Sequence, residues 1–242
     1  MISSQACESI TELAESVYKK FTINSTVEGI KFASIGKISD TNRLYWLRIG
    51  KCANTFIDHH TPTLTDIKYH EDYNKLISSK YRGFVVLRDP LERWISGAVS
   101  YYIQDNEINK FDVNESVKFF DSLIKDKNYL SLTATNYLIE KLSYDFHGLP
   151  QVWHLYPVNV KNIDFFWMDN KLGDHLNHYL RDHNVQNNMN NKKINESNKN
   201  NLVYNFFKNF VLHPDNLKYK QKILLNLSYD YQLQSLINFY KK

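Results

Sequence analysis

The chain shows one local pattern twice: a short apolar run leads into a turn and then into a segment whose apolar residues have helical spacing. The first run is YWLRI, residues 45–49, followed by GKCANT, and the second is GFVVL, residues 83–87, followed by RDPLERW. Strands that lead directly into helices are typical of βα units around a parallel sheet. We therefore expect an α/β fold with both turns at the carboxyl ends of neighbouring strands.

The other periodic segments fit the same architecture. Helical spacing of apolar residues predicts helices over residues 8–21, 172–180, 202–212 and 217–240, and mostly helical chain over 112–142. Residues 163–168 have the composition of another buried strand. Residues 186–201, QNNMNNKKINESNKNN, contain almost no apolar side chains, so a mobile loop is expected there.

Composition narrows the classes of function. The 242 residues carry 30 Lys plus Arg against 26 Asp plus Glu, and the net charge of +4 suits an anionic ligand but is too small to indicate a nucleic-acid partner. The two cysteines do not suggest a disulfide framework and favour a reducing compartment. Neither a membrane span nor a signal peptide is predicted, so we expect a cytoplasmic protein without a membrane partner.

The second turn has the composition of an anion site. DPLE, residues 89–92, supplies an N-cap, a first helical proline and a capping-box glutamate, so a helix should begin where the strand stops. Its apolar stripe consists of Leu91, Trp94, Ile95, Ala98, Val99 and Tyr102. Another face carries Arg93, Ser96, Gly97 and Ser100. Small residues there would also suit helix packing, but Arg88 at the strand end favours a phosphate-sized anion.

The first turn is a phosphate loop in layout. GKCANT, residues 50–55, would present successive backbone N–H groups, a lysine and a hydroxyl to an anion. It is not a Walker A sequence, because its lysine stands near the start of the loop. A lysine and a threonine in one turn are more often solvated residues. Two such turns in one βα array make the anion-site interpretation stronger.

These motifs resemble the sulfotransferases that use 3'-phosphoadenosine 5'-phosphosulfate (PAPS), in particular the carbohydrate, Golgi-type branch with its 2-O-sulfotransferases. The resemblance rests on GKCANT, VVLRDPLERWISGAVSYY, DFHGLPQVWHL, IDFFWMDNKLGDHLNHYL, INES and LSYDYQL, with RDPxxRxxS the most specific part. It covers roughly residues 45–240, whereas residues 1–44 match no element that we can name. It implies one sulfotransferase-like domain over residues 1–242, with a three-layer P-loop-type fold and a central, mostly parallel sheet flanked by helices.

The resemblance also implies roles for residues of the first loop. Lys51 would contact the bridging oxygen of the phosphosulfate, and Thr55 would bind the 5'-phosphate. The assisting backbone N–H groups would be those of Cys52, Ala53, Asn54, Thr55 and Phe56. The loop departs from the family, which often has proline at the position of Gly50, glycine at that of Ala53, and serine or threonine at that of Asn54. Alanine adopts a positive φ only at a cost, which would lower cofactor affinity without changing the layout.

The same resemblance assigns the other end of the nucleotide. Arg88 and Ser96 would hold the 3'-phosphate, so the small-residue helix face would lie against the nucleotide. Arg93 would either join them or form a structural ion pair. Asn195 and Ser197, from INES, would belong to a loop that covers the cofactor. The product would be adenosine 3',5'-bisphosphate (PAP).

Transfer to a hydroxyl group requires a general base, and histidine suits this task near neutral pH. His70 lies near the position at which the uronyl 2-O-sulfotransferases keep a catalytic histidine. His147 stands in an H-x-x-P-Q element that borders the acceptor in other branches. We rank His70 slightly ahead of His147, and expect His59 and His60 to be surface or packing residues. No metal is expected, because the sulfuryl oxygens carry less charge than those of a phosphoryl group.

Two other functions remain open. One is a non-catalytic anion- or glycan-binding protein on the same fold. The other is a P-loop-type nucleotide kinase, which the missing Walker A order and magnesium aspartate disfavour. The acceptor, a glycan or a small molecule, should be selected by loops at residues 61–75, 105–116 and 186–201. Its identity and the oligomeric state do not follow from the sequence.

Overall fold

The computed structural model describes residues 3–22, 36–105, 148–187, 204–205, 208–209 and 217–240. The chain divides into two compact units. The first comprises Met1–Pro90, Pro150–Asn195 and Tyr229–Lys242, and the second comprises Leu91–Leu149 and Glu196–Ser228. The predicted helical stretch 112–142, and most of 186–201 and 202–212, lie outside the described residues. That the whole chain is one domain stays a prediction.

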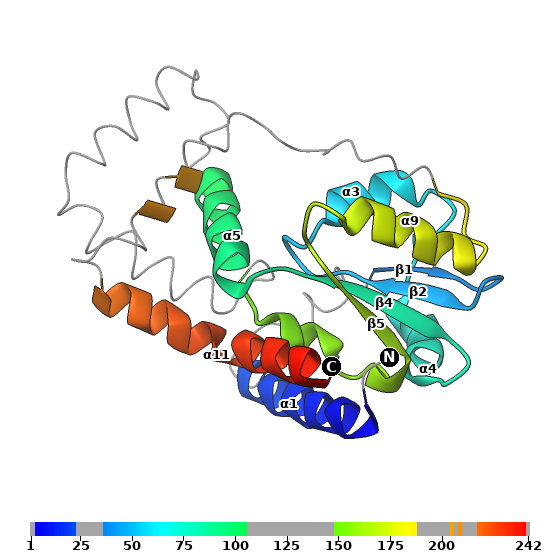
Figure 1. Ribbon diagram of the computed structural model, residues 1–242, viewed down its shortest axis with the longest axis horizontal. Helices are drawn as coiled ribbons and strands as arrows, with labels where there is room; N and C mark the ends of the chain where they lie inside the picture. The colour runs from blue at the N-terminus through cyan, green and yellow to red at the C-terminus, as the bar shows by residue number, and fades with distance from the viewer. Residues whose placement is uncertain are drawn as a thin grey trace, which may run out of the picture. The chain divides into compact units, whose positions relative to one another are not determined.

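A five-stranded sheet of order β3-β1-β2-β4-β5 forms the centre of the first unit (Figure 1). Its strands are β1 (Gly36–Ser39), β2 (Leu44–Leu47), β3 (Thr65–Asp66), β4 (Arg82–Leu87) and β5 (Ile163–Trp167). β2, β4 and β5 are parallel neighbours, and β1 is antiparallel to both β2 and β3. All strands except β1 therefore run in one direction. The predicted α/β fold with a mostly parallel sheet is confirmed, whereas β1 and β3 were not predicted.

β4 lies inside the sheet, between β2 and β5, and its sequence suits burial on both faces. Residues 83–87 are all buried, as the continuous apolar run GFVVL predicts for a strand with helices on either side. On one face, the missing side chain of Gly83 leaves room for the ring of Tyr45 on β2 and the end of Ile163 on β5. On the other face, the ring of Phe84 contacts that of Tyr179, with centroids 5.5 Å apart.

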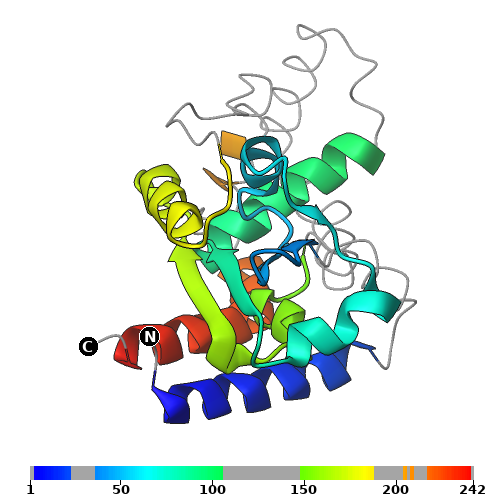
Figure 2. The ribbon, with the colours of Figure 1, turned by 90° about the vertical axis from the view of Figure 1, so that its right-hand side faces the viewer.

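Helices cover both faces of the sheet in the first unit. Figure 1 shows α3 (Asn54–His60) and α9 (Leu172–Asp182) on one face and α4 (Tyr69–Ile77) on the other. In Figure 2, α1 (Ser4–Thr22) and the end of α11 (Leu217–Tyr240) run below the sheet, opposite α9. α1 also packs against the 3-10 helices η3 (Gln151–Leu155) and η4 (Val160–Asn162). None of the helices in the described stretches combines the length and hydropathy of a membrane span.

An ion pair fixes the amino-terminal ends of β4 and β5 to α9. The Arg82 guanidinium donates to both Asp164 carboxylate oxygens, at 2.6 and 2.7 Å, and the Tyr179 hydroxyl donates to the same carboxylate at 2.9 Å. Burial, and then the Asp164 charge, raise the pKa of Tyr179, so its phenol stays neutral and keeps donating. This cluster lies at the sheet edge opposite the two predicted turns, where its role is structural.

The helix α5 (Pro90–Asp105) belongs to the second unit from Leu91 onward, and it begins at the proline that DPLE predicted as a first helical residue. The side chains of Trp94, Ile95, Ala98 and Val99 are buried, as the predicted apolar stripe requires. Glu92 in the first turn of α5 pairs with Lys208 at 3.2 Å.

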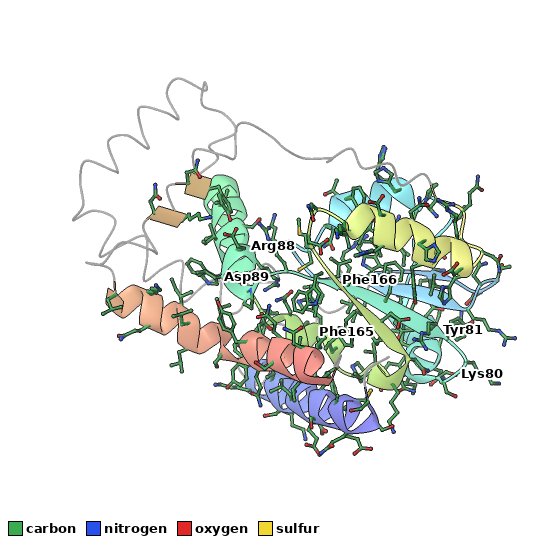
Figure 3. The ribbon with its side chains drawn as sticks, in the orientation of Figure 1. Lys80, Tyr81, Arg88, Asp89, Phe165 and Phe166 are labelled. Atoms are coloured by element: carbon green, nitrogen blue, oxygen red, sulfur yellow. The ribbon has the colours of Figure 1, made fainter. Side chains whose placement is uncertain are left out.

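We expect Gly83→Ala to lower the free energy of unfolding by about 1–3 kcal/mol, because it overpacks the core. A Cβ atom there would lie 2.4 Å from Cζ of Tyr45 and 2.5 Å from Cδ1 of Ile163. The Tyr45 side chain is fully buried and cannot swing into solvent. Urea denaturation measures the change. Lys80→Ala, at an exposed site near the start of β4 (Figure 3), is the control and should cost less than about 0.5 kcal/mol. Equal stability of the two variants would contradict the packing argument.

Candidate functional site

Both predicted turns lie at the same edge of the sheet. β2 and β4 are parallel neighbours in which Leu47 pairs with Val85, so the residues that follow them leave the sheet together. Figure 3 shows Arg88 and Asp89 where β4 ends, with Lys80 and Tyr81 at the far end of the same strand. The expected placement of the two turns at neighbouring strand ends is confirmed.

The first turn adopts an unusual backbone conformation. Lys51 has φ 63° and Ala53 has φ 61°, both in the left-handed region. The Cys52 N–H donates to the Ile49 carbonyl at 3.2 Å, and α3 starts immediately after Ala53. Left-handed residues in such a turn are typical of concavities in which successive N–H groups bind an anion. Lys51 lies in this turn and is half-buried, and Thr55 is exposed in the first turn of α3. The lysine and the hydroxyl group that were predicted to bind an anion are therefore both accessible at this turn.

Ala53 adopts the positive φ that is costly for alanine. A residue with a Cβ atom in the left-handed region costs roughly 1–2 kcal/mol, whereas glycine adopts it freely. The first turn is therefore held in a strained conformation at Ala53. The neighbouring Asn54 has a buried Oδ1 atom that accepts no hydrogen bond from the residues that the structure describes.

α3 is fixed to the sheet by one carboxylate. Asp58 lies 3.1 Å from the Lys37 ammonium on β1 and accepts two hydrogen bonds from Arg48, just after β2, at 2.9 and 3.1 Å. The guanidinium of Arg48 in turn lies 5.3 Å from the centre of the Trp46 ring. Lys37 belongs to β1 and Arg48 follows β2. Through these two contacts, Asp58 fixes α3, the helix that follows the first turn, to the sheet.

The adjacent histidines of α3 have the ordinary roles that were expected. His60 is buried, its Nδ1 lies 2.8 Å from the Phe56 carbonyl, and its ring packs against that of Phe56; His59 is exposed. In the described part of the chain, no three His, Cys, Asp or Glu side chains form a group that could hold a metal. That the reaction needs no metal stays a prediction.

Gln151 joins the two turns. Its Oε1 atom accepts hydrogen bonds from the Arg88 backbone N–H at 2.9 Å and from the Cys52 thiol at 3.4 Å. Its Nε2 atom donates to the Arg88 carbonyl at 2.9 Å and to the Asp230 carboxylate at 3.4 Å. Asp230 also accepts from the Val152 N–H at 3.2 Å. The Gln151 and Asp230 side chains are only 2% and 1% exposed, so water does not replace these contacts.

The sequence-based analysis did not assign a role to Gln151 or Asp230. A signal was present, because each is a polar residue within a run of apolar and aromatic neighbours, LPQVWHL and LSYDYQL. Polar side chains in buried segments are nearly always hydrogen-bonded. That pattern predicts a buried polar contact, but it does not identify the partner.

The predicted residues of α5 belong to the second unit. Arg93 is fully buried, which favours the structural alternative over contact with a ligand. Ser96 is half-buried. Arg88 belongs to the first unit, where it is half-buried at the end of β4. The joint role of Arg88 and Ser96 stays a prediction.

The strand that precedes His70 ends level with β2. β3 and β2 are both antiparallel to β1, so they run in the same direction. The Ile67 N–H, just after β3, donates to the Gly36 carbonyl, and Gly36 pairs with Leu47 at the end of β2. α4 therefore begins two residues after the point at which the chain lies level with the end of β2, and His70 is its second residue.

We expected a loop at residues 61–75, and this prediction is wrong for the second half of the range. β3 and α4 occupy part of it, and the side chain of Asp72 accepts the Lys68 N–H at 2.9 Å at the start of α4. The sequence YHEDYNKLI has only a short apolar pattern, and this is why the helix was not expected. His147, Asn195 and Ser197 lie outside the described residues, so their roles stay predictions.

Comparison with known proteins gives one match. A model of the sulfotransferase family matches residues 36–242. The matched range contains every strand of the sheet, both turns, and the Gln151 and Asp230 side chains. Neither the curated proteins nor the solved structures gave a match.

We expect Ala53→Gly to raise the free energy of unfolding by about 1 kcal/mol. The substitution removes the steric cost of the left-handed conformation, which exceeds the extra chain entropy that glycine loses on folding. Urea denaturation measures the gain. Ala98→Gly, in the interior of α5, is the opposite control and should destabilise the protein. A loss of stability on Ala53→Gly would mean that the turn does not have this backbone conformation.

Proposed function

The chain belongs to the sulfotransferase family, and we propose that it moves a sulfuryl group from PAPS to a hydroxyl group of a carbohydrate. One observation carries the proposal: the Cys52 thiol and the Arg88 backbone N–H both donate hydrogen bonds to Oε1 of Gln151. Two anion-binding turns held this close together suit the two ends of one doubly phosphorylated nucleotide. One turn alone would suit many phosphate ligands.

The charges at this edge fit such a ligand. Lys51 and Arg88 are half-buried, which limits the screening of their charges by water. Asp58, the carboxylate of α3, is already paired with Lys37 and Arg48, so it does not oppose an incoming anion. Lys51, Thr55 and the N–H groups of residues 52–56 would hold the 5'-phosphosulfate, and Arg88 with Ser96 would hold the 3'-phosphate.

These residues would perform the parts of the reaction that a protein must supply. When bound, PAPS supplies the sulfuryl group. Lys51 neutralises negative charge that grows on the leaving phosphate, which is the task that preorganised positive groups perform best. The turns align the donor with the acceptor oxygen for in-line transfer. A histidine takes the proton of the acceptor hydroxyl group.

His70 is our first choice for that base, and His147 is the second. Support for His70 comes from the backbone, because α4 begins two residues after Ile67, which lies level with the end of β2. A base must come within hydrogen-bond reach of the acceptor hydroxyl, so a position at this edge is a requirement.

We further propose a cytoplasmic location and an acceptor that is a glycan or a small molecule. Neither Cys7 nor Cys52 forms a disulfide and both are buried, in keeping with a reducing compartment. A non-catalytic glycan-binding protein is the main alternative. Transfer of labelled sulfate from PAPS to a panel of glycans separates the two functions, because only an enzyme forms sulfated product.

We expect Lys51→Ala to abolish sulfate transfer, and Arg88→Ala to weaken PAP binding by about 2 kcal/mol, the scale of a lost charged partner. Titration calorimetry with PAP measures the second effect, and the labelled-sulfate assay measures the first. Lys80→Ala and Arg181→Ala remove exposed basic residues elsewhere in the first unit and should change neither quantity. Unchanged PAP affinity in Arg88→Ala would refute the assignment of the second turn.

We expect His70→Ala to lower kcat about 100-fold or more and to remove the acid limb of the pH–rate profile, because the base must be neutral to accept a proton. His147→Ala should have a smaller effect. Initial rates at several pH values, with PAP affinity measured in parallel, separate loss of the base from loss of binding. Full activity in both variants would mean that the base is another residue.

A further inference from the structure

We propose that Gln151 is a positioning residue that sets the distance between the two anion-binding turns, and that Asp230 fixes the orientation of its amide. The inference rests on the proposed function, in which the turns grip opposite ends of one nucleotide. It starts from the position of a single buried amide between the Cys52 turn and the Arg88 turn.

The amide takes the place of a missing strand residue beside β4. Backbone groups of successive residues in a strand point to opposite neighbours. The Arg82 N–H donates to the Arg43 carbonyl, just before β2. The Leu87 carbonyl accepts a hydrogen bond from the Met168 N–H, just after β5. The backbone of Arg88 therefore points to the β2 side, where β2 has already ended at Leu47. The Gln151 amide meets both groups there, at 2.9 Å each, as a neighbouring peptide would.

The same amide also reaches the first turn. Oε1 also accepts the Cys52 thiol, and Cys52 lies between the two left-handed residues, Lys51 and Ala53. One oxygen atom thus contacts the centre of the first turn and the start of the second. A shift of the amide would move one turn relative to the other.

Asp230 determines which way the amide faces. A glutamine amide has one accepting and one donating end, and a flip by half a turn would set Oε1 against the Arg88 carbonyl. The Asp230 carboxylate, itself bonded to the Val152 N–H, can only accept, so it holds the Nε2 end towards itself. The donors at Arg88 and Cys52 then meet Oε1.

This arrangement predicts an effect that depends on the number of phosphate groups. A ligand with two phosphates gains from both turns only when their separation matches its own length, as for any pair of linked binding sites. A ligand with one phosphate needs one turn and is insensitive to that separation. Loss of the Gln151 amide should therefore weaken PAP far more than it weakens either monophosphate.

The test compares three ligands on the full chain: PAP, adenosine 5'-monophosphate and adenosine 3'-monophosphate, the last two followed by ligand-observed NMR. For Gln151→Ala, PAP affinity should fall about tenfold or more, and the affinity for each monophosphate less than about threefold. Gln232→Ala, at an exposed glutamine of α11, should change none of them. Equal losses for all three ligands, or no loss for PAP, would overturn the inference. A wild-type protein that binds PAP no better than the monophosphates would instead overturn the proposed function.

Gln151→Glu keeps the size of the side chain and tests the hydrogen-bond pattern directly. The titratable groups in contact with this position are the Cys52 thiol and the Asp230 carboxyl. Burial and the Asp230 charge should raise the pKa of the introduced carboxyl group. Its neutral form can accept from the Arg88 N–H and donate to the Arg88 carbonyl, whereas its ionised form cannot donate.

The PAP affinity of Gln151→Glu, divided by that of the wild type at the same pH, should therefore recover as the pH falls from about 8 to about 6. The same ratio for the monophosphates should stay flat. A PAP ratio that does not change with pH would overturn the assignment of the amide's two-sided role, even if Gln151→Ala fails to fold.

Discussion

The parallel pairing of β2 with β4 is the constraint on which the candidate site depends. Parallel neighbours end at one edge of a sheet, so the turn after β2 and the turn after β4 must lie side by side. Gly83 favours this pairing, because the Tyr45 ring occupies the space of its missing side chain. A steric detail inside the core thus stabilises the register that brings the two turns together.

Buried polar side chains also fix the positions of the two turns. Backbone pairing brings the turns to one edge, but β2 ends before β4 and leaves the Arg88 backbone without a strand partner on that side. Gln151 supplies this partner and Asp230 supplies the partner of Gln151. Buried polar networks of this kind are favourable only when every member is satisfied. The requirement explains why residues from η3 and α11 converge on turns far from them in sequence.

Much of the fold was predictable because its signals are local. Apolar periodicity predicted the bounds of α9 and α11 closely, and the proline of DPLE predicted the first residue of α5. The short outer strands β1 and β3 and the helix α4 were not predicted, since each carries few apolar residues and owes its shape to pairing with neighbours. Gln151 and Asp230 were visible as polar residues in apolar runs, but their partners lie up to 99 positions away.

The sequence by itself determined the two turns and their chemistry: a lysine and a hydroxyl in one, an arginine before a capped helix in the other. These properties depend on neighbouring residues along the chain, so they can be seen without a structure. Only the tertiary structure decided that the turns share a contact with one buried amide. This contact results from packing between distant segments, whose geometry no local pattern encodes.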